Sequence, residues 1–170
     1  MTISIQDLGV GCQPNFYKLV NPRFHNDLYW DDGNYDLAPE MAIDCLRTKS
    51  DLNGLNPTSH AHSSGNLRDG EFKQFLVDTL APASINLVTI YPRIDCCRHR
   101  YVDLEVHVVG TEGQPVKCNQ KDNVTMDTSY INGLIDHDQG IDFDCGGEIG
   151  QTITATCYNY HLQIAEIEAS

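Results

Sequence analysis

The chain has 170 residues, of which 24 are acidic and 11 basic, so its formal net charge is −13 at neutral pH. This length suits a single domain, residues 1–170, with a sizeable buried core. The acidic balance argues against nucleic acid or anionic lipid as the main partner, and no stretch approaches the roughly 18 apolar residues that a membrane-spanning helix needs. Cations, neutral ligands and carbohydrate stay compatible with this charge.

The first seventy residues show little regular pattern. The chain opens with Met-Thr-Ile-Ser-Ile, which lacks the basic and apolar regions of a signal peptide. Either a signal was removed and Met1 is an expression start, or the protein has none. From about residue 24 to about residue 70 the sequence is polar and aromatic, without the alternation of a strand. A loop of this length in a compact domain tends to carry function or to be disordered.

Strand patterns begin after this segment and continue to the C-terminus. Residues 85–91 form an apolar run rich in β-branched side chains, typical of a central strand. In residues 101–109, Val102, Leu104, Val106 and Val108 alternate with polar residues, which indicates a strand with one buried face. Further strands are expected at 72–78, 141–145, 151–157 and 160–168. Short strands with Gly-, Pro- and Asn-rich connections predict an all-β antiparallel β-sandwich or barrel.

Between two of these strands lies an octet, residues 93–100, with the sequence Arg-Ile-Asp-Cys-Cys-Arg-His-Arg. Arg93 and Arg100 carry rigid forks of donors that stay protonated, and Asp95 can hold one guanidinium in place. A bond between Cys96 and Cys97 would close a strained ring and offer a flat sulfur surface; otherwise each cysteine bridges elsewhere. A sugar has matching hydroxyls and an apolar C–H face. The octet therefore indicates a site for an oxygen-rich ligand, with a basic loop that balances local acid as the alternative.

The last expected strand ends near an acidic residue. Leu162, Ile164 and Glu166 share one face by alternation, and that face begins apolar. A carboxylate on an inward face is costly unless it is paired or bound to a metal. We therefore predict an oxygen-rich cation site, calcium by preference, with Asp44 from the long loop as a second carboxylate. The alternative is that the strand ends one residue earlier and Glu166 is solvated.

Seven cysteines in 170 residues indicate an oxidising compartment. No Cys-x-x-Cys pair and no close Cys/His quartet resembles a zinc site. The glycosylation sequon at residues 123–125, Asn-Val-Thr, agrees with a secreted, extracellular protein. Because the count is odd, one thiol is either unpaired or bonded between chains.

At residues 75–100 the chain resembles the F-type lectins, the fucolectin family. That family carries a histidine upstream of Arg-x-Asp and a further Arg or Lys, and Arg93, Asp95 and Arg100 fit this spacing with the adjacent cysteines in place. Residues 41–44, Met-Ala-Ile-Asp, look like the family's Asn-Ala-Ile-Asp loop, and residues 162–167 look like its terminal strand. The similarity covers most of the chain from about residue 39. It implies a jelly-roll β-sandwich of discoidin-like class that binds L-fucose beside a structural Ca²⁺.

The resemblance also implies roles in the sugar site. Arg93 and Arg100 would donate to the ring oxygen and hydroxyls of fucose, and Asp95 would orient the arginines. A vicinal disulfide between Cys96 and Cys97 would stack on the apolar edge of the sugar.

The family histidine is assigned to His62, with His60 as the alternative. A neutral imidazole there can donate to or accept from an axial hydroxyl. The apolar pocket for the fucose methyl group has only candidate residues: Tyr29, Trp30, Leu52 and Leu55.

For calcium, the resemblance implies side-chain oxygens from Asp44 and Glu166. Backbone carbonyls would come from Met41, Leu46 and Ser59. Cys118 with Cys145 resembles a family disulfide between neighbouring strands. The remaining cysteines, Cys12, Cys45 and Cys157, have no assigned partners, although a bond between the first two is one suggestion.

The sequence thus predicts a non-catalytic, calcium-containing lectin for L-fucose and fucosylated glycans. The alternative is a protein–protein recognition or adhesion domain of the same fold with a degenerate sugar site. A glycosidase is the third class, because acidic pairs occur at residues 31–32 and 136 with 138, although solvated turns explain them better. A metal site on His60 and His62 is a further minor alternative. Assembly into a homo-oligomer fits a single-site lectin, which gains avidity that way.

Overall fold

The structure is a computed structural model that describes residues 16–24, 42–43, 61–62, 72–91, 101, 103–121, 140–158, 162–164 and 166–170. Its strands are β1 (Leu19–Phe24), β2 (Ala61–His62), β3 (Lys73–Tyr91), β4 (Leu104–Val109), β5 (Pro115–Lys117), β6 (Asn119–Gln120), β7 (Ile141–Cys157), β8 (Gln163–Ile164) and β9 (Glu166–Ala169). Every pairing among them is antiparallel. The all-β antiparallel prediction is therefore confirmed. Over this described part of the chain, no helix has the length and apolar character needed to cross a bilayer.

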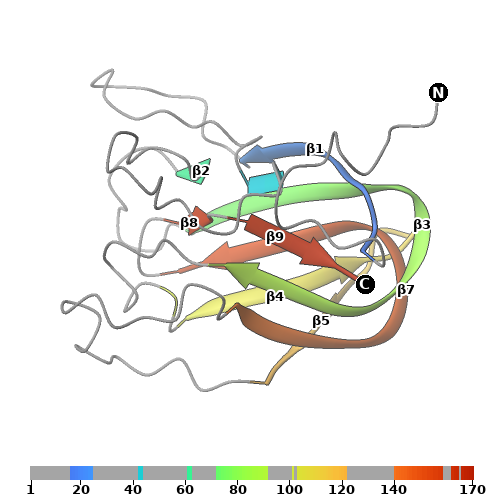
Figure 1. Ribbon diagram of the computed structural model, residues 1–170. Coiled ribbons are helices and arrows are strands. Elements are labelled where there is room, and N and C mark those ends of the chain that lie inside the picture. Colours follow the sequence, from blue (N-terminus) through green and yellow to red (C-terminus); the bar gives the residue numbers. More distant parts are fainter. Residues whose placement is uncertain are drawn as a thin grey trace.

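Two long strands, β3 and β7, form the centre of the sandwich and turn back at the same end of the molecule (Figure 1). The first half of β3 pairs with the second half of β7, and the second half of β3 pairs with the first half of β7. β1 and β4 flank the first pair of halves, whereas β9 and β6 flank the second. The two bent strands thus contribute to both layers, here called the first layer (with β1 and β4) and the second layer (with β6 and β9).

The bend arises from local irregularities in the ladder. The register between β3 and β7 shifts between Asp78 and Ala83 and again between Ile85 and Leu87. Opposite the second shift, Gly146 and Gly147 have φ of 62° and 78°, a left-handed backbone that glycine adopts readily. Such bulges bend a strand and increase its twist. They let one continuous strand pass from the first layer to the second.

The strand boundaries therefore correct several expectations. The segments 72–78 and 85–91 are parts of one strand, and so are 141–145 and 151–157, because the bulges keep the backbone extended where proline and glycine suggested turns. The segment expected at 160–168 contains two separate strands, β8 and β9, and β4 begins at Leu104 rather than at residue 101. β2 lies inside the segment expected to be a loop, and β1, β5 and β6 were not expected.

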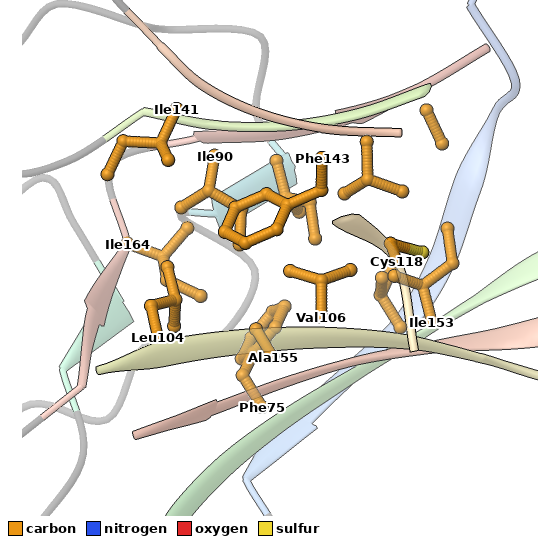
Figure 2. Packing of buried hydrophobic residues seen from close by; sticks show 14 of the residues in the cluster. Phe75, Ile90, Leu104, Val106, Cys118, Ile141, Phe143, Ile153, Ala155 and Ile164 are labelled. Carbon is orange, nitrogen blue, oxygen red and sulfur yellow. The ribbon is translucent and has the colours of Figure 1, made fainter. Parts of the chain in front are cut away.

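The hydrophobic core lies between the two layers (Figure 2). In β4, Leu104, Val106 and Val108 are buried while Glu105 and His107 are partly exposed, which confirms the expected alternation. Val106 faces Phe143 of the second layer in Figure 2, and both are at most 1% exposed. The remaining labelled core residues are Phe75, Ile90, Leu104, Cys118, Ile141, Ile153, Ala155 and Ile164. Close packing of these side chains holds the layers together.

A disulfide joins Cys118, which lies between β5 and β6, to Cys145 in β7. Both cysteines are buried, at 2% and 8% exposure. The pairing that the family resemblance implied is therefore confirmed. Cys157 is buried at the end of β7, while Cys12 and Cys45 lie outside the described residues.

Candidate functional site

The ends of β3, β7 and β9 that lie away from the bend adjoin, in the sequence, the segments that carry the predicted site. Lys73 pairs with Cys157, and Ile90 pairs with Ile141, so the start of β3 and its end lie at this same end of the sandwich. The start of β9 lies there too, since Glu166 pairs with Tyr91. We call this end of the sandwich the loop end.

Most of the predicted site residues lie outside the described part of the chain. Of the sugar site, this holds for Arg93, Asp95, Cys96, Cys97 and Arg100. Of the calcium site, it holds for Met41, Asp44, Leu46 and Ser59. The same is true of the histidine alternative and of the methyl-pocket candidates, His60, Tyr29, Trp30, Leu52 and Leu55. The structure describes the backbone of His62, all of Glu166, and the chain neighbours of several others.

Two buried tyrosines bracket the octet that carries the arginines. Tyr91 is 7% exposed and ends β3 two residues before Arg93, and Tyr101 is 1% exposed and directly follows Arg100. A methyl group built on Gly140 would lie 3.1 Å from a ring carbon of Tyr91, so the ring packs closely against that glycine. The residues on both sides of the segment that contains the octet are thus buried in the core. The sequence analysis did not single out these tyrosines, since their burial depends on distant strands.

His62 belongs to β2, where it pairs with Gln163 of β8. Its neighbour Ala61 pairs with Ile164, which is fully buried. β8 precedes β9, which begins at Glu166, so the backbone of His62 is paired to the segment that leads into the loop end. The structure therefore ties the chosen histidine to the terminal strands rather than leaving it in an unpaired loop.

Glu166 lies inside β9 and is 2% exposed. The alternative in which the strand ends early and Glu166 is solvated is therefore wrong. Glu168, two residues further, is 4% exposed and shares the same face of β9 by alternation. Glu168 is opposite Thr89 of β3, whose hydroxyl donates to the carboxylate of Asp142 in β7 at 2.7 Å. Acidic side chains of β9 and β7 thus flank Thr89 of β3, an arrangement that the sequence analysis missed because only the strand pairing reveals it.

The candidate calcium loop is attached to the core at two residues. Ala42 is fully buried and belongs to the core cluster, and Ile43 packs against that cluster. In Figure 1 this short turn, drawn in cyan, lies between β1 and β9 in this view. Met41 and Asp44 are the sequence neighbours of these two residues.

No group of three or more His, Cys, Asp or Glu side chains that could hold a metal occurs among the residues that the structure describes. A calcium site that uses Glu166 therefore requires donors from outside that part, as the prediction of Asp44 and the three backbone carbonyls supposes. Carboxylates and carbonyls are the oxygen donors that Ca²⁺ prefers, so this donor set fits the ion.

No protein-family model and no curated protein matches the sequence. The fold nevertheless resembles solved structures. The lectin domain of lectinolysin, solved with the Lewis B antigen, has a TM-score of 0.60 at 15% identity, over 99% of this chain and 98% of that one. A fucolectin from striped bass (Morone saxatilis) serum has a TM-score of 0.57 at 18% identity, over 91% of this chain and 48% of that one.

A family 32 carbohydrate-binding module from Clostridium perfringens, solved with GalNAc-β-1,3-galactose, has a TM-score of 0.56 at 14% identity, over 89% of this chain and 94% of that one. The same architecture therefore occurs in modules whose ligands differ. At these levels of identity the comparisons show the fold. The chain folds as the discoidin-like β-sandwich that fucolectins and related carbohydrate-binding modules share.

Proposed function

We propose that this protein is a non-catalytic lectin that binds L-fucose and fucosylated glycans at the loop end. The observation that carries the proposal is the position of the Arg-x-Asp octet: it begins two residues after buried Tyr91 and ends directly before buried Tyr101. Buried residues on either side of a binding segment reduce the conformational freedom that binding must remove. The likeness of the fold to fucose-binding modules supports the same ligand.

In this proposal Arg93 and Arg100 donate to the oxygens of the sugar, and Asp95 keeps a guanidinium in the orientation that binding requires. Charge-assisted hydrogen bonds of this kind are about twice as strong as neutral ones. Cys96 and Cys97 provide an apolar contact for a C–H face, and His62 adds one polar contact. The octet, rather than the fold, favours fucose, since the same fold occurs in a module solved with a galactose-containing ligand.

Calcium would be a structural ion held by Asp44, Glu166 and the carbonyls of Met41, Leu46 and Ser59. Burial of Glu166 at 2% exposure supports this assignment, because a carboxylate in such surroundings is stabilised by a nearby cation. The positive charge of the ion would hold the loop that carries Asp44 to β9. Secretion agrees with the disulfide between Cys118 and Cys145, since such bonds persist in oxidising compartments.

The test is the Arg93→Ala variant, compared with wild type by titration calorimetry with L-fucose and on a glycan array. Loss of its charge-assisted bonds should lower affinity by about 100-fold, since each such bond contributes roughly 1.5–3 kcal/mol. Arg23→Ala is the matched control, because Arg23 pairs with Asp78 in the first layer and should leave binding unchanged. Full binding by the Arg93 variant would reject the site. A wild-type protein that ignores every fucosylated glycan would favour the protein-recognition alternative.

A further inference from the structure

A recess of about 490 Å³ opens where β4, β5, β6 and both ends of β7 meet. Its volume lies within the roughly 300–1,000 Å³ that is usual for small-molecule sites. None of its lining residues belongs to the sugar or calcium site proposed above. Six lining side chains can form hydrogen bonds with a ligand there: Asp103, Glu105, Lys117, Asn119, Gln120 and Tyr158.

Two carboxylates, Asp103 and Glu105, and one ammonium group, Lys117, line this recess. The ammonium of Lys117 donates to one carboxylate oxygen of Glu105 at 2.7 Å, and the hydroxyl of Tyr158 donates to the other at 3.2 Å. The hydrogen bond from Lys117 lowers the pKa of Glu105, so this carboxylate stays ionised at neutral pH. Lys117 offsets the charge of Glu105 and leaves Asp103 as the second carboxylate of the lining, so the recess disfavours an anionic ligand. The amides of Asn119 and Gln120 add neutral donors and acceptors.

An aromatic surface borders the same recess. Tyr158 is 46% exposed, and Phe72, beside it, is 44% exposed. Their ring centroids are 6.2 Å apart at an interplanar angle of 53°. The bond from Tyr158 to Glu105 holds the tyrosine ring in one orientation. Half-exposed aromatic rings next to polar side chains provide large contact area at low entropic cost.

We propose that this recess is a second saccharide site, which takes a neutral sugar by stacking its C–H face on Tyr158. The hydroxyls of the sugar bond to Glu105, Asn119 and Gln120. The inference rests on the proposed function only for the class of ligand. Two sites on one chain would let the protein hold a branched glycan at two points or cross-link two glycans, with a gain in avidity.

The experiment records amide NMR shifts of ¹⁵N-labelled full-length protein during titration with lactose, maltose, cellobiose and N,N′-diacetylchitobiose. Concentrations reach about 20 mM, since one stacked ring and a few hydrogen bonds correspond to millimolar affinity. At least one sugar should shift the amides of Lys117, Asn119 and Gln120. The same shifts should appear in Arg93→Ala, which separates this site from the proposed fucose site.

Tyr158→Ala should weaken that binding by about 2- to 10-fold, since one aromatic stacking contact is worth roughly 0.5–1.5 kcal/mol. Tyr158→Phe keeps the ring and should retain most of the binding. Tyr17→Ala is the matched control: Tyr17 is 39% exposed and donates to the carbonyl of Ser84, on the other side of the molecule, near the bend. Asn119→Ala, at an exposed position in β6, tests the polar contacts without a large risk to folding.

The proposal is overturned if no sugar of the panel shifts those amides, or if Tyr158→Ala and Asn119→Ala both bind as wild type does. Failure of the fucose proposal gives a different result. In that case L-fucose has no effect on the wild type, while the panel still shifts Lys117, Asn119 and Gln120.

Discussion

Asp78 shows how opposing effects set the charge of a single residue. Burial raises its pKa, but hydrogen bonds from Thr152 at 2.8 Å and from Arg23 at 3.1 Å outweigh burial and lower the pKa below its ordinary value of 3.8. A carboxyl whose folded pKa is lowered stabilises the fold above its unfolded pKa. This contribution decreases as the pH falls below 3.8 and is lost below the folded pKa.

Asp78→Asn should therefore lower the free energy of unfolding by about 1 kcal/mol at pH 7. The substitution removes the negative charge to which Arg23 and Thr152 donate hydrogen bonds. The effect should be modest because the Arg23 side chain is 45% exposed. Urea denaturation at pH 7 and at pH 3 measures it, and the difference between wild type and variant should shrink at pH 3. Glu105→Gln is the control, with a smaller loss, since its partner Lys117 is 58% exposed. An equal loss at both pH values would contradict the assignment to the charge.

At the scale of single residues, only part of the candidate site can be recognised in the sequence. The spacing of Arg93, Asp95 and Arg100 is visible in the sequence because it is a local motif. The burial of Glu166 was only one of two alternatives, since alternation cannot say where a strand ends. The neighbouring Glu168 and Asp142 could not be connected to it, because their relation depends on which strands pair.

Among the elements, β7 depends on a glycine at its contact with β4. A methyl group at Gly150 would lie 2.5 Å from a side-chain carbon of Val108 and 2.6 Å from the carbonyl oxygen of Val109. The second of these atoms belongs to the backbone, so it cannot move without disturbing β4.

Gly150→Ala should therefore lower the midpoint of thermal unfolding, with a loss of about 1–3 kcal/mol as for other overpacked sites. Gly110→Ala is the matched control: its added methyl group would lie 3.5 Å from the nearest atom, an ordinary contact. Calorimetry of both variants tests the prediction. Equal melting temperatures for the two would show that β4 can shift to accept the methyl group.

The disulfide connects the segment between β5 and β6 to β7, across 27 positions in the sequence. Cross-linking a loop of this length stabilises a fold by about 3.5 kcal/mol when only chain entropy is counted. The double variant Cys118→Ala/Cys145→Ala should therefore unfold at a markedly lower urea concentration. Cys157→Ala, at another buried cysteine, controls for the loss of a buried sulfur. A similar shift in the control would show that packing, rather than the cross-link, is responsible.

The boundaries of the strands show where local sequence patterns fail to predict the structure. The alternation in β4 predicted its buried face correctly, since period-two burial is a property of the strand itself. In β3, the sequence pattern predicted two separate strands, 72–78 and 85–91, on either side of Pro82. The continuous pairing with β7 instead carries the strand through the bend. The short strands β1, β5 and β6 have too few residues in a clear alternation to be recognised before their partners are known.

For the whole molecule, the proposed calcium site makes stability depend on the ion. An ion that binds only the folded state stabilises it by mass action, by about 2.7 kcal/mol when its concentration is 100 times the dissociation constant. EDTA should therefore lower the melting temperature, and excess Ca²⁺ should restore it. Glu166→Gln should abolish this response, whereas Glu148→Gln, at a partly exposed position of β7, should keep it. No response to EDTA in the wild type would remove Glu166 and Asp44 as ligands.

The sequence by itself determined the all-β class, the alternating face of β4, and the motif that places two arginines and an aspartate within eight residues. These features are local, since strand periodicity and motif spacing depend on neighbours along the chain. The tertiary structure decided the rest: the bend shared by β3 and β7, the burial of Tyr91, Tyr101 and Glu166, and the recess beside Tyr158. Each of these requires contacts between segments far apart in the sequence, whose pairing is selected by the packing of the whole core.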